Sequence, residues 1–587
     1  MTPIAVPGRI GRRDAAALAT LVVAGVGVPL LLSAAAGAIG IPSTDDWVYI
    51  RGADSLFRTG AIAMPAHTAA SIGQLVLVQP LLWLSRGNTW AFTAFGLIMA
   101  GTGLASTYLL ARRFVGFGSA AMVVLSVEAF PGFAREAATF MTDVPTFALI
   151  TLCLLVGTRW LQGEGRRATL VASLGVGLLA VTIREFAIAA PAAILVVAWA
   201  RSRPQERVWL AVVSGVFAVA VACVILVARS LSGSEIPLAP QLLWLAHDGQ
   251  AFATLAAVLL PAIVLGLGRR MPTLHSQQVI AGAALVCLAF APPIEPLVGQ
   301  LWMSEGLVGD ALLSGTRVPV IGRLAWGLSE QVALFSAILL AALVLRWGQR
   351  NLARITSLST AVARAIRLVR SRDGALFLFL VAYAVELAVV TAMTYPQDRY
   401  LYPMVAPAAI LLLRGPARPI RLGRRHAFSH AALAWLAVSA FVIAANAFAY
   451  DAARWRAGEA AVGMGYDAGT VDAGYEWVGY HASGIGNSRW ADYGLTWYDD
   501  ALLTHRPCAV VSNSPLQPAG FTLLREDRSA YRQYLFFGPE EPLYLYGSTT
   551  SGCPTPPGTI AARKPLAGRE YTSAIVQGSS SQEASAS

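Results

Sequence analysis

Two adjacent carboxylates, Asp45 and Asp46, follow the first long apolar run of the sequence, in the segment Ser43-Thr-Asp-Asp-Trp-Val-Tyr49. At the start of a helix, neighbouring side chains point about 100° apart, so the two carboxylates can have different roles. One of them could simply cap a helix. Because neighbouring carboxylates repel, one of them needs a raised pKa or a cationic partner. Either state suits a general base or a metal ligand, so this pair is the first candidate for catalysis.

Three further side chains of chemical interest stand at the ends of later apolar runs. Asp143 opens one such run, where it could also act as a helix cap. Arg184 lies in a short hairpin between two runs, and Arg399 precedes Tyr400 in another. A guanidinium fork matches the oxygens of a phosphate, although Arg184 could instead only reach towards the membrane surface. If these ends share one face, a lipid phosphate and a hydroxyl acceptor could meet there.

The composition shows which elements must position these residues. Of 587 residues, 56% are hydrophobic and only 13% are charged, whereas soluble domains carry about 25% charged residues. The sequence therefore predicts a polytopic α-helical membrane protein. Apolar stretches of spanning length predict thirteen helices, near residues 15–40, 88–111, 117–133, 143–161, 168–183, 185–200, 208–229, 250–268, 276–293, 325–346, 374–394, 401–414 and 427–450.

The arginines set the predicted orientation. Loops assigned to the cytoplasm hold 25 arginines and the outer loops hold nine, which places the N-terminus inside and the C-terminal part outside a bacterial cell membrane. The net charge of +11 follows this pattern, so nucleic-acid binding is excluded as a function. To keep the alternation, we interpret Ala69–Ser85 as a helix along the outer membrane surface and Trp347–Arg372 as an amphipathic helix on the cytoplasmic surface.

The predicted domains are a cytoplasmic segment 1–14, a transmembrane domain 15–450 with an outer loop 41–87, an extracytoplasmic α/β domain 451–577 and a disordered tail 578–587. In the α/β domain, Cys508-Ala-Val-Val-Ser, Tyr534-Leu-Phe-Phe and Pro542-Leu-Tyr-Leu-Tyr are typical of strands. Outside the cytoplasm, Cys508 and Cys553 can form a disulfide. Closing this loop would contribute roughly 4 kcal/mol by the chain-entropy estimate.

The segment Asp45-Asp46-Trp47-Val48-Tyr49 resembles the acidic signature of membrane glycosyltransferases of the GT-C fold. The closest group is the family of protein O-mannosyltransferases and lipid A aminoarabinose transferases. Thr142-Asp143 resembles the acidic motif of their second outer loop, and Arg184 and Arg399-Tyr400 are similar to their phosphate-facing arginines. The resemblance covers roughly residues 15–450. The Lys-Pro-Pro element of the family's first loop is missing, and Gln79-Pro80 stands nearest to it.

The resemblance implies a polyprenyl-phosphate sugar donor, with a sugar of the mannose or arabinose class, and an envelope glycan, lipid or protein as acceptor. It implies transfer with inversion at a site close to membrane lipids. Asp45 would be the general base, and Asp46 or Asp143 would orient the site or bind a metal. A divalent ion (Mg, Mn or Ca) would be held by His247 and Asp46. Arg184, Arg399 and Tyr400 would bind the donor phosphate.

Two other classes of function compete with this one. A transporter or lipid flippase would need ionisable residues at mid-span and internal repeats; Glu386 is the best candidate for the former, and no repeat is visible. A non-catalytic envelope assembly or sensor protein would use only the outer domain. The gathering of acidic residues and arginines in outer loops favours the transferase.

Overall fold

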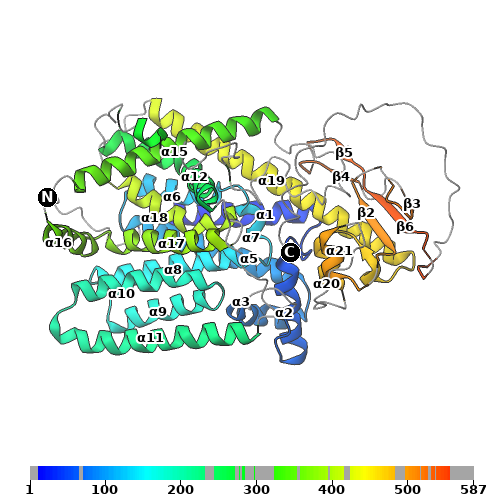
Figure 1. Ribbon diagram of the computed structural model, residues 1–587, viewed down its shortest axis with the longest axis horizontal. Coiled ribbons are helices and arrows are strands. Elements are labelled where there is room, and N and C mark those ends of the chain that lie inside the picture. Colours follow the sequence, from blue (N-terminus) through cyan, green and yellow to red (C-terminus); the bar gives the residue numbers. More distant parts are fainter. Residues whose placement is uncertain are drawn as a thin grey trace.

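The computed structural model describes residues 11–64, 71–231, 244–270, 323–352, 357–393, 397–414 and 424–482, most of 496–554, and a few residues between 277 and 297. A large helical part and a small sheet-containing part lie side by side, and one long helix, α19 (Arg424–Gly463), runs from the first into the second (Figure 1). The predicted tail 578–587 and most of the helix predicted at 276–293 lie outside the described residues.

Eight of the described helices are long and apolar enough to cross a membrane. They include α19 and are otherwise α1 (Arg12–Ala36), α5 (Trp90–Arg112), α8 (Asp143–Leu161), α11 (Pro204–Leu231), α12 (Trp244–Arg270), α15 (Arg323–Leu352) and α17 (Gly374–Met393). In α11 only 11% of the apolar window is buried, against 83% in α12. An apolar helix that is exposed on most sides requires an apolar solvent. The predicted class, a polytopic helical membrane protein, is thus confirmed, while the count of thirteen spans stays a prediction.

Shorter helices complete the transmembrane part and carry the residues of interest. Four of them hold or adjoin residues of interest: α2 (Asp46–Thr59), α7 (Phe133–Ala137) and the 3-10 turns η1 (Glu185–Ile188) and η2 (Asp398–Leu401). The remaining ones are α3 (Ile72–Leu77), α4 (Gln79–Ser85), α6 (Phe117–Glu128), α9 (Arg167–Val181), α10 (Ala189–Arg201), α16 (Leu358–Val369) and α18 (Tyr402–Leu413).

Two predicted surface helices are each divided in the structure. Ala69–Ser85 contains α3 and α4, which meet at Val78 just before Pro80, a residue that suits the first turn of a helix. The segment Trp347–Arg372 is not one helix, because α15 continues through Trp347 to Leu352 and α16 starts anew at Leu358. The new start is fixed by a capping box between Ser357 and Thr360.

The C-terminal part contains a four-stranded sheet in the order β1-β2-β6-β3. Its strands are β1 (Val471–Asp472), β2 (Ala509–Ser512), β3 (Phe521–Arg525) and β6 (Tyr544–Ser548). A second pair joins β4 (Tyr531–Arg532) and β5 (Glu540–Glu541), and two short helices, α20 (Tyr475–His481) and α21 (Trp497–Leu502), complete the domain. The predicted small α/β domain and the disulfide between Cys508 and Cys553 are both confirmed.

The strand predicted at Tyr534-Leu-Phe-Phe is wrong. Tyr534 and Leu535 have φ angles of 54° and 63°, and they form a turn after β4. Side chains rarely adopt this left-handed conformation within a strand. Helix α19 also extends thirteen residues beyond the apolar run that ends at Tyr450, because residues 451–463 are rich in alanine, the strongest helix former.

A buried carboxyl group makes the sheet domain sensitive to pH. Burial raises the pKa of Asp472 to about 6, against the lowering effect of a hydrogen bond from the Gly474 N–H. A raised pKa means that the folded state holds its proton more tightly than the unfolded state does. The stability contributed by the protonated group is therefore lost as the pH rises from about 4 to about 6.

We expect the full-length protein in detergent to become more stable, by on the order of 1–2 kcal/mol, when the pH falls from 6.5 to 5. Asp472→Asn should remove this pH dependence, because the amide does not titrate. Thermal unfolding of both proteins across this range measures the difference. Asp467→Asn, at an exposed carboxylate of the same domain, is the control. Parallel curves for the wild type and Asp472→Asn would contradict the prediction.

Candidate active site

A buried arginine lies at the centre of the candidate site. The side chain of Arg399, in η2, is only 2% exposed. Its Nη2 lies 3.0 Å from Oδ2 of Asp45, its Nη1 lies 3.4 Å from Oε1 of Glu136, and its Nε lies 3.4 Å from Oδ2 of Asp143. One guanidinium group thus holds three carboxyl groups, one from Asp45 and two from the segment Glu136–Asp143.

Helix ends bring these groups together. Asp45 immediately precedes α2, Glu136 lies in α7, and Asp143 is the first residue of α8. The loop between α7 and α8 packs closely on α5, where a side chain at Gly96 would place its Cβ 2.4 Å from the carbonyl oxygen of Thr139. This close approach keeps Glu136 and Asp143 at one end of the helices, facing Arg399.

The charges of the cluster nearly balance. Burial and the neighbouring Asp143 together raise the pKa of Glu136 to about 8, although Arg399 opposes the shift. At neutral pH Glu136 is therefore largely protonated. That leaves the carboxylates of Asp45 and Asp143 beside two guanidinium groups, because Nη2 of Arg184 lies 3.5 Å from Oδ2 of Asp143. A balanced cluster of this kind can be buried at a much lower cost than an unpaired charge.

The neighbours Asp45 and Asp46 have different environments. Asp45 makes no helix-capping bond through its side chain; Oδ2 contacts Arg399, and Oδ1 accepts a hydrogen bond from Tyr475 at 3.1 Å. Its side chain keeps 33% exposure. Asp46 is buried and accepts hydrogen bonds from the N–H groups of Ser43 at 2.6 Å and Phe140 at 3.2 Å. Asp45 is thus open to a reactant, whereas Asp46 fixes the loop.

Burial raises the pKa of Asp46 well above its usual value, and the backbone hydrogen bonds oppose this shift. Between Asp46 and the first span, Thr44 adopts a φ of 56°, which is unfavourable for a β-branched residue. Its N–H donates to Oε1 of Glu476 at 3.0 Å. The loop Ser43–Asp46 is therefore held in a conformation that its own sequence does not favour, as is typical of functional sites.

A second buried ion cluster supports this loop. Nη2 of Arg135 lies 2.8 Å from Oδ2 of Asp451 in α19 and donates to Oγ of Ser43 at 2.6 Å. Arg454, one turn further along α19, pairs with Glu476 of α20. The loop is thus connected to α7, to α19 and to the C-terminal domain.

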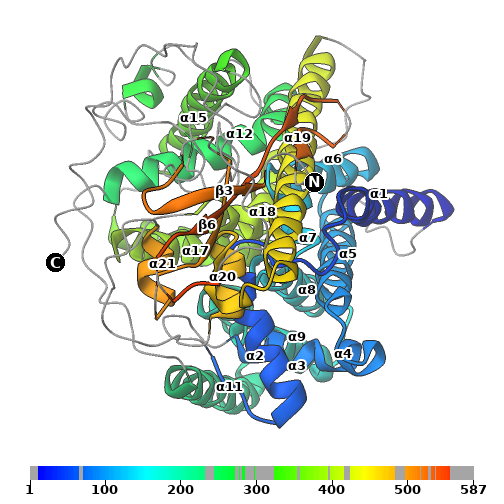
Figure 2. The ribbon, with the colours of Figure 1, turned by 90° about the vertical axis from the view of Figure 1, so that its right-hand side faces the viewer.

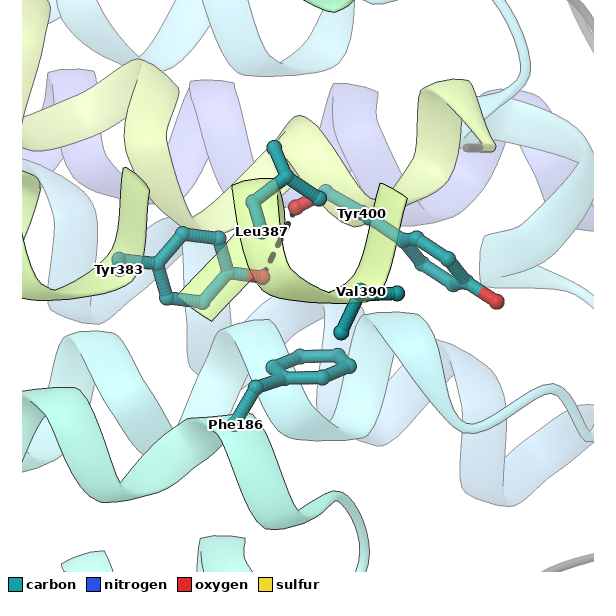
Figure 3. A pocket seen from close by; sticks show the side chains of 5 residues that line it. All are labelled: Phe186, Tyr383, Leu387, Val390 and Tyr400. Carbon is teal, nitrogen blue, oxygen red and sulfur yellow. Dashed lines mark hydrogen bonds between the residues drawn. The ribbon is translucent and has the colours of Figure 1, made fainter. Parts of the chain in front are cut away.

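Arg184 lies between the carboxylates and a small apolar pocket. Its Nε donates to Oγ1 of Thr142 at 2.6 Å, and its guanidinium lies 5.9 Å and 5.6 Å from the ring centres of Phe186 and Tyr400. Those two rings line the pocket together with Tyr383, Leu387 and Val390 (Figure 3). The hydroxyl of Tyr383 is already hydrogen-bonded, because it donates to the carbonyl oxygen of Tyr400 at 2.8 Å.

The structure therefore gathers Asp45, Asp143, Arg184, Arg399 and Tyr400 at one place, and it connects Asp46 to them through the loop. His247 lies buried in α12, and its neighbour Asp248 accepts a hydrogen bond from Thr391. Within the described residues, no group of three or more His, Cys, Asp or Glu side chains could hold a metal ion. The divalent metal stays a prediction.

Two participants were not predicted to lie in this cluster. Glu136 lies only seven residues before Asp143, and that proximity between two carboxyl groups is a usable signal. Tyr475 is 430 residues away from Asp45, and nothing in its local sequence distinguishes it from the other tyrosines of the C-terminal part.

Fold and site together define a multi-pass membrane protein with a buried charged cluster at one end of its helices, in contact with its C-terminal domain. No family model and no curated protein matches the chain. Among solved structures, the chain is similar to ArnT from Cupriavidus metallidurans in the apo state, with 12% identity, a TM-score of 0.38, and coverage of 90% of this chain and 98% of the other. For ArnT bound to undecaprenyl phosphate the values are 11%, 0.39, 91% and 99%.

Proposed function

We propose that this protein is a membrane glycosyltransferase that moves a sugar from a polyprenyl phosphate to a hydroxyl acceptor. The observation that carries the proposal is the position of Asp45: it is partly open, it is paired with the buried Arg399, and Asp143 links it to Arg184 beside the apolar pocket. Carboxylate, guanidinium and apolar pocket correspond to the three parts of the reaction, namely the acceptor proton, the donor phosphate and the donor lipid.

The chemistry is a single displacement. Asp45 removes the proton of the acceptor hydroxyl as that oxygen bonds to the anomeric carbon, and the bond from this carbon to the phosphate oxygen breaks. The polyprenyl phosphate leaves with the electron pair of that bond, and attack from the opposite face inverts the anomeric configuration.

We assign different roles to Arg399 and Arg184. Arg399 is almost fully buried, and its guanidinium is already paired with three carboxyl groups, so its role is to hold Asp45 in place. Arg184 keeps 20% exposure of its side chain and contacts a single carboxylate at 3.5 Å, which leaves it able to contact the phosphate. From the arginine distribution in the loops, we propose that this end of the helices faces the outside of a bacterial cell. The sugar belongs to the mannose or arabinose class, and the acceptor is an envelope glycan, lipid or protein.

Arg184→Met tests the assignment of the donor phosphate. Losing a hydrogen bond to a charged group costs about 1.5–3 kcal/mol, so KM for the donor should rise about ten- to a hundredfold while kcat changes much less. Arg184→Lys should recover only part, because a single ammonium group cannot form the fork.

Steady-state kinetics with a synthetic polyprenyl-phosphate sugar measures these constants. Arg58→Met is the control, because Arg58 is an exposed arginine of α2 whose partner is Asp54. An unchanged KM for the donor in Arg184→Met would remove Arg184 from the phosphate site.

A further inference from the structure

Two consecutive residues of the C-terminal domain reach the loop that carries Asp45. Helix α20 follows β1 directly, and its first residue, Tyr475, donates its hydroxyl hydrogen to Oδ1 of Asp45 at 3.1 Å. The next residue, Glu476, accepts the N–H of Thr44 at 3.0 Å. The carboxylate of Asp45 is thus held on one oxygen by the C-terminal domain and on the other by Arg399 of the transmembrane domain.

The contact between α20 and α2 is closely packed as well as polar. The rings of Trp47 and Tyr475 meet edge to face with centres 5.7 Å apart. A Cβ added at Gly479 would lie 2.2 Å from the indole of Trp47. Arg51, one turn further along α2, donates to the carbonyl oxygens of Gly479 and Ala482 at 2.9 and 2.8 Å. The two helices lie side by side in both views (Figure 1, Figure 2).

The hydroxyl of Tyr475 is suited to a permanent donor role. Burial raises the pKa of Tyr475 well above its usual value, and the charge of Asp45 raises it further. The hydroxyl therefore keeps its proton at any physiological pH. A hydrogen bond donated to a carboxylate favours the ionised form, which is the form that a general base needs.

We infer that the C-terminal domain is a structural part of the active site, and that Tyr475 is the positioning residue that orients Asp45 for proton removal. The inference rests on the proposed function, in which Asp45 is the base. It assigns to residues 475–482 a catalytic purpose that is separate from binding the donor. Removing the hydroxyl should therefore alter the chemical step and leave the donor affinity unchanged.

Tyr475→Phe removes only the hydroxyl and keeps the ring against Trp47. We expect kcat to fall about ten- to a hundredfold, the loss typical of a hydrogen bond to a charged group, with KM for the donor unchanged. The acid limb of the pH–rate profile should move to higher pH, because the carboxylate loses a bond that favours its charged form. Tyr498→Phe is the matched control: its ring packs on Tyr475, but its hydroxyl donates to Asp472.

A second measurement does not depend on turnover. Gly479→Ala should separate α20 from Trp47, so hydrogen exchange in the peptide that contains residues 43–47 of the full-length protein should become faster than in the wild type. Equal kcat and equal pH profiles for Tyr475→Phe and Tyr498→Phe would overturn the role of Tyr475, and unchanged exchange in Gly479→Ala would overturn the docking. If the wild type transfers no sugar at all, the proposed function fails, whereas the exchange measurement still decides whether the domain holds the loop.

Discussion

Asp45→Asn is expected to lower turnover by about 10²–10⁴-fold, the usual contribution of general base catalysis. Asparagine keeps the size of the side chain, and its oxygen can still accept the hydrogen bond from Tyr475. The amide cannot remove a proton, however. Expression, thermal stability and donor affinity should stay close to the wild type, because the side chain is partly exposed and its neighbour Asp46 holds the loop.

Asp54→Asn, in the same helix α2 and paired with the exposed Arg58, provides the control for the loss of a carboxylate outside the cluster. It should be fully active. If Asp45 has only a structural role through its contacts with Tyr475 and Arg399, asparagine should serve nearly as well as aspartate, and Asp45→Asn would keep its activity. That result would remove Asp45 as the base.

Arg399→Ala should abolish transfer and also destabilise the protein by about 3–5 kcal/mol, the cost of removing one partner from a buried ion pair. Without the guanidinium, three carboxyl groups remain together in a buried space with the more distant Arg184 as their cation. Arg399→Lys should restore part of the stability but little activity, because one ammonium group cannot replace contacts made by three different nitrogens.

Thermal unfolding in detergent together with sugar transfer separates the two effects. Arg58→Ala, which breaks an exposed ion pair, should change the stability by less than about 1 kcal/mol. An Arg399→Ala protein with wild-type stability would show that the three carboxyl groups do not depend on this arginine.

The helices were largely predictable from the sequence because the bilayer requires long apolar runs. The stretch predicted at 143–161 coincides with α8, and the one at 374–394 with α17 (Gly374–Met393). Two predictions failed. The helix predicted at Trp347–Arg372 is divided because a capping box starts α16 at Leu358, and the strand predicted at Tyr534 is a turn with positive φ angles. Neither is visible in hydrophobicity alone.

The sequence predicted which residues would lie together in the candidate site, but it did not predict the role of each residue. Outer-loop carboxylates and arginines indicated Asp45, Asp143, Arg184 and Arg399, and the structure brings them together. The adjacent residues Asp45 and Asp46 differ through contacts that their sequence does not show: Asp46 accepts hydrogen bonds from the N–H groups of the nearby Ser43 and the distant Phe140. The bond from Tyr475 depends on the folding of a domain more than 400 residues further along the chain.

Sugar transfer from a polyprenyl phosphate with Asp45 as the base can be tested directly. The most direct measurement incubates the purified wild type and Asp45→Asn with labelled polyprenyl-phosphate mannose or arabinose and extracted envelope acceptors, and determines the anomeric configuration of the product by NMR. We expect a product of inverted configuration with the wild type and at least a hundredfold less with Asp45→Asn. A product of retained configuration, or equal product from both proteins, would contradict the claim.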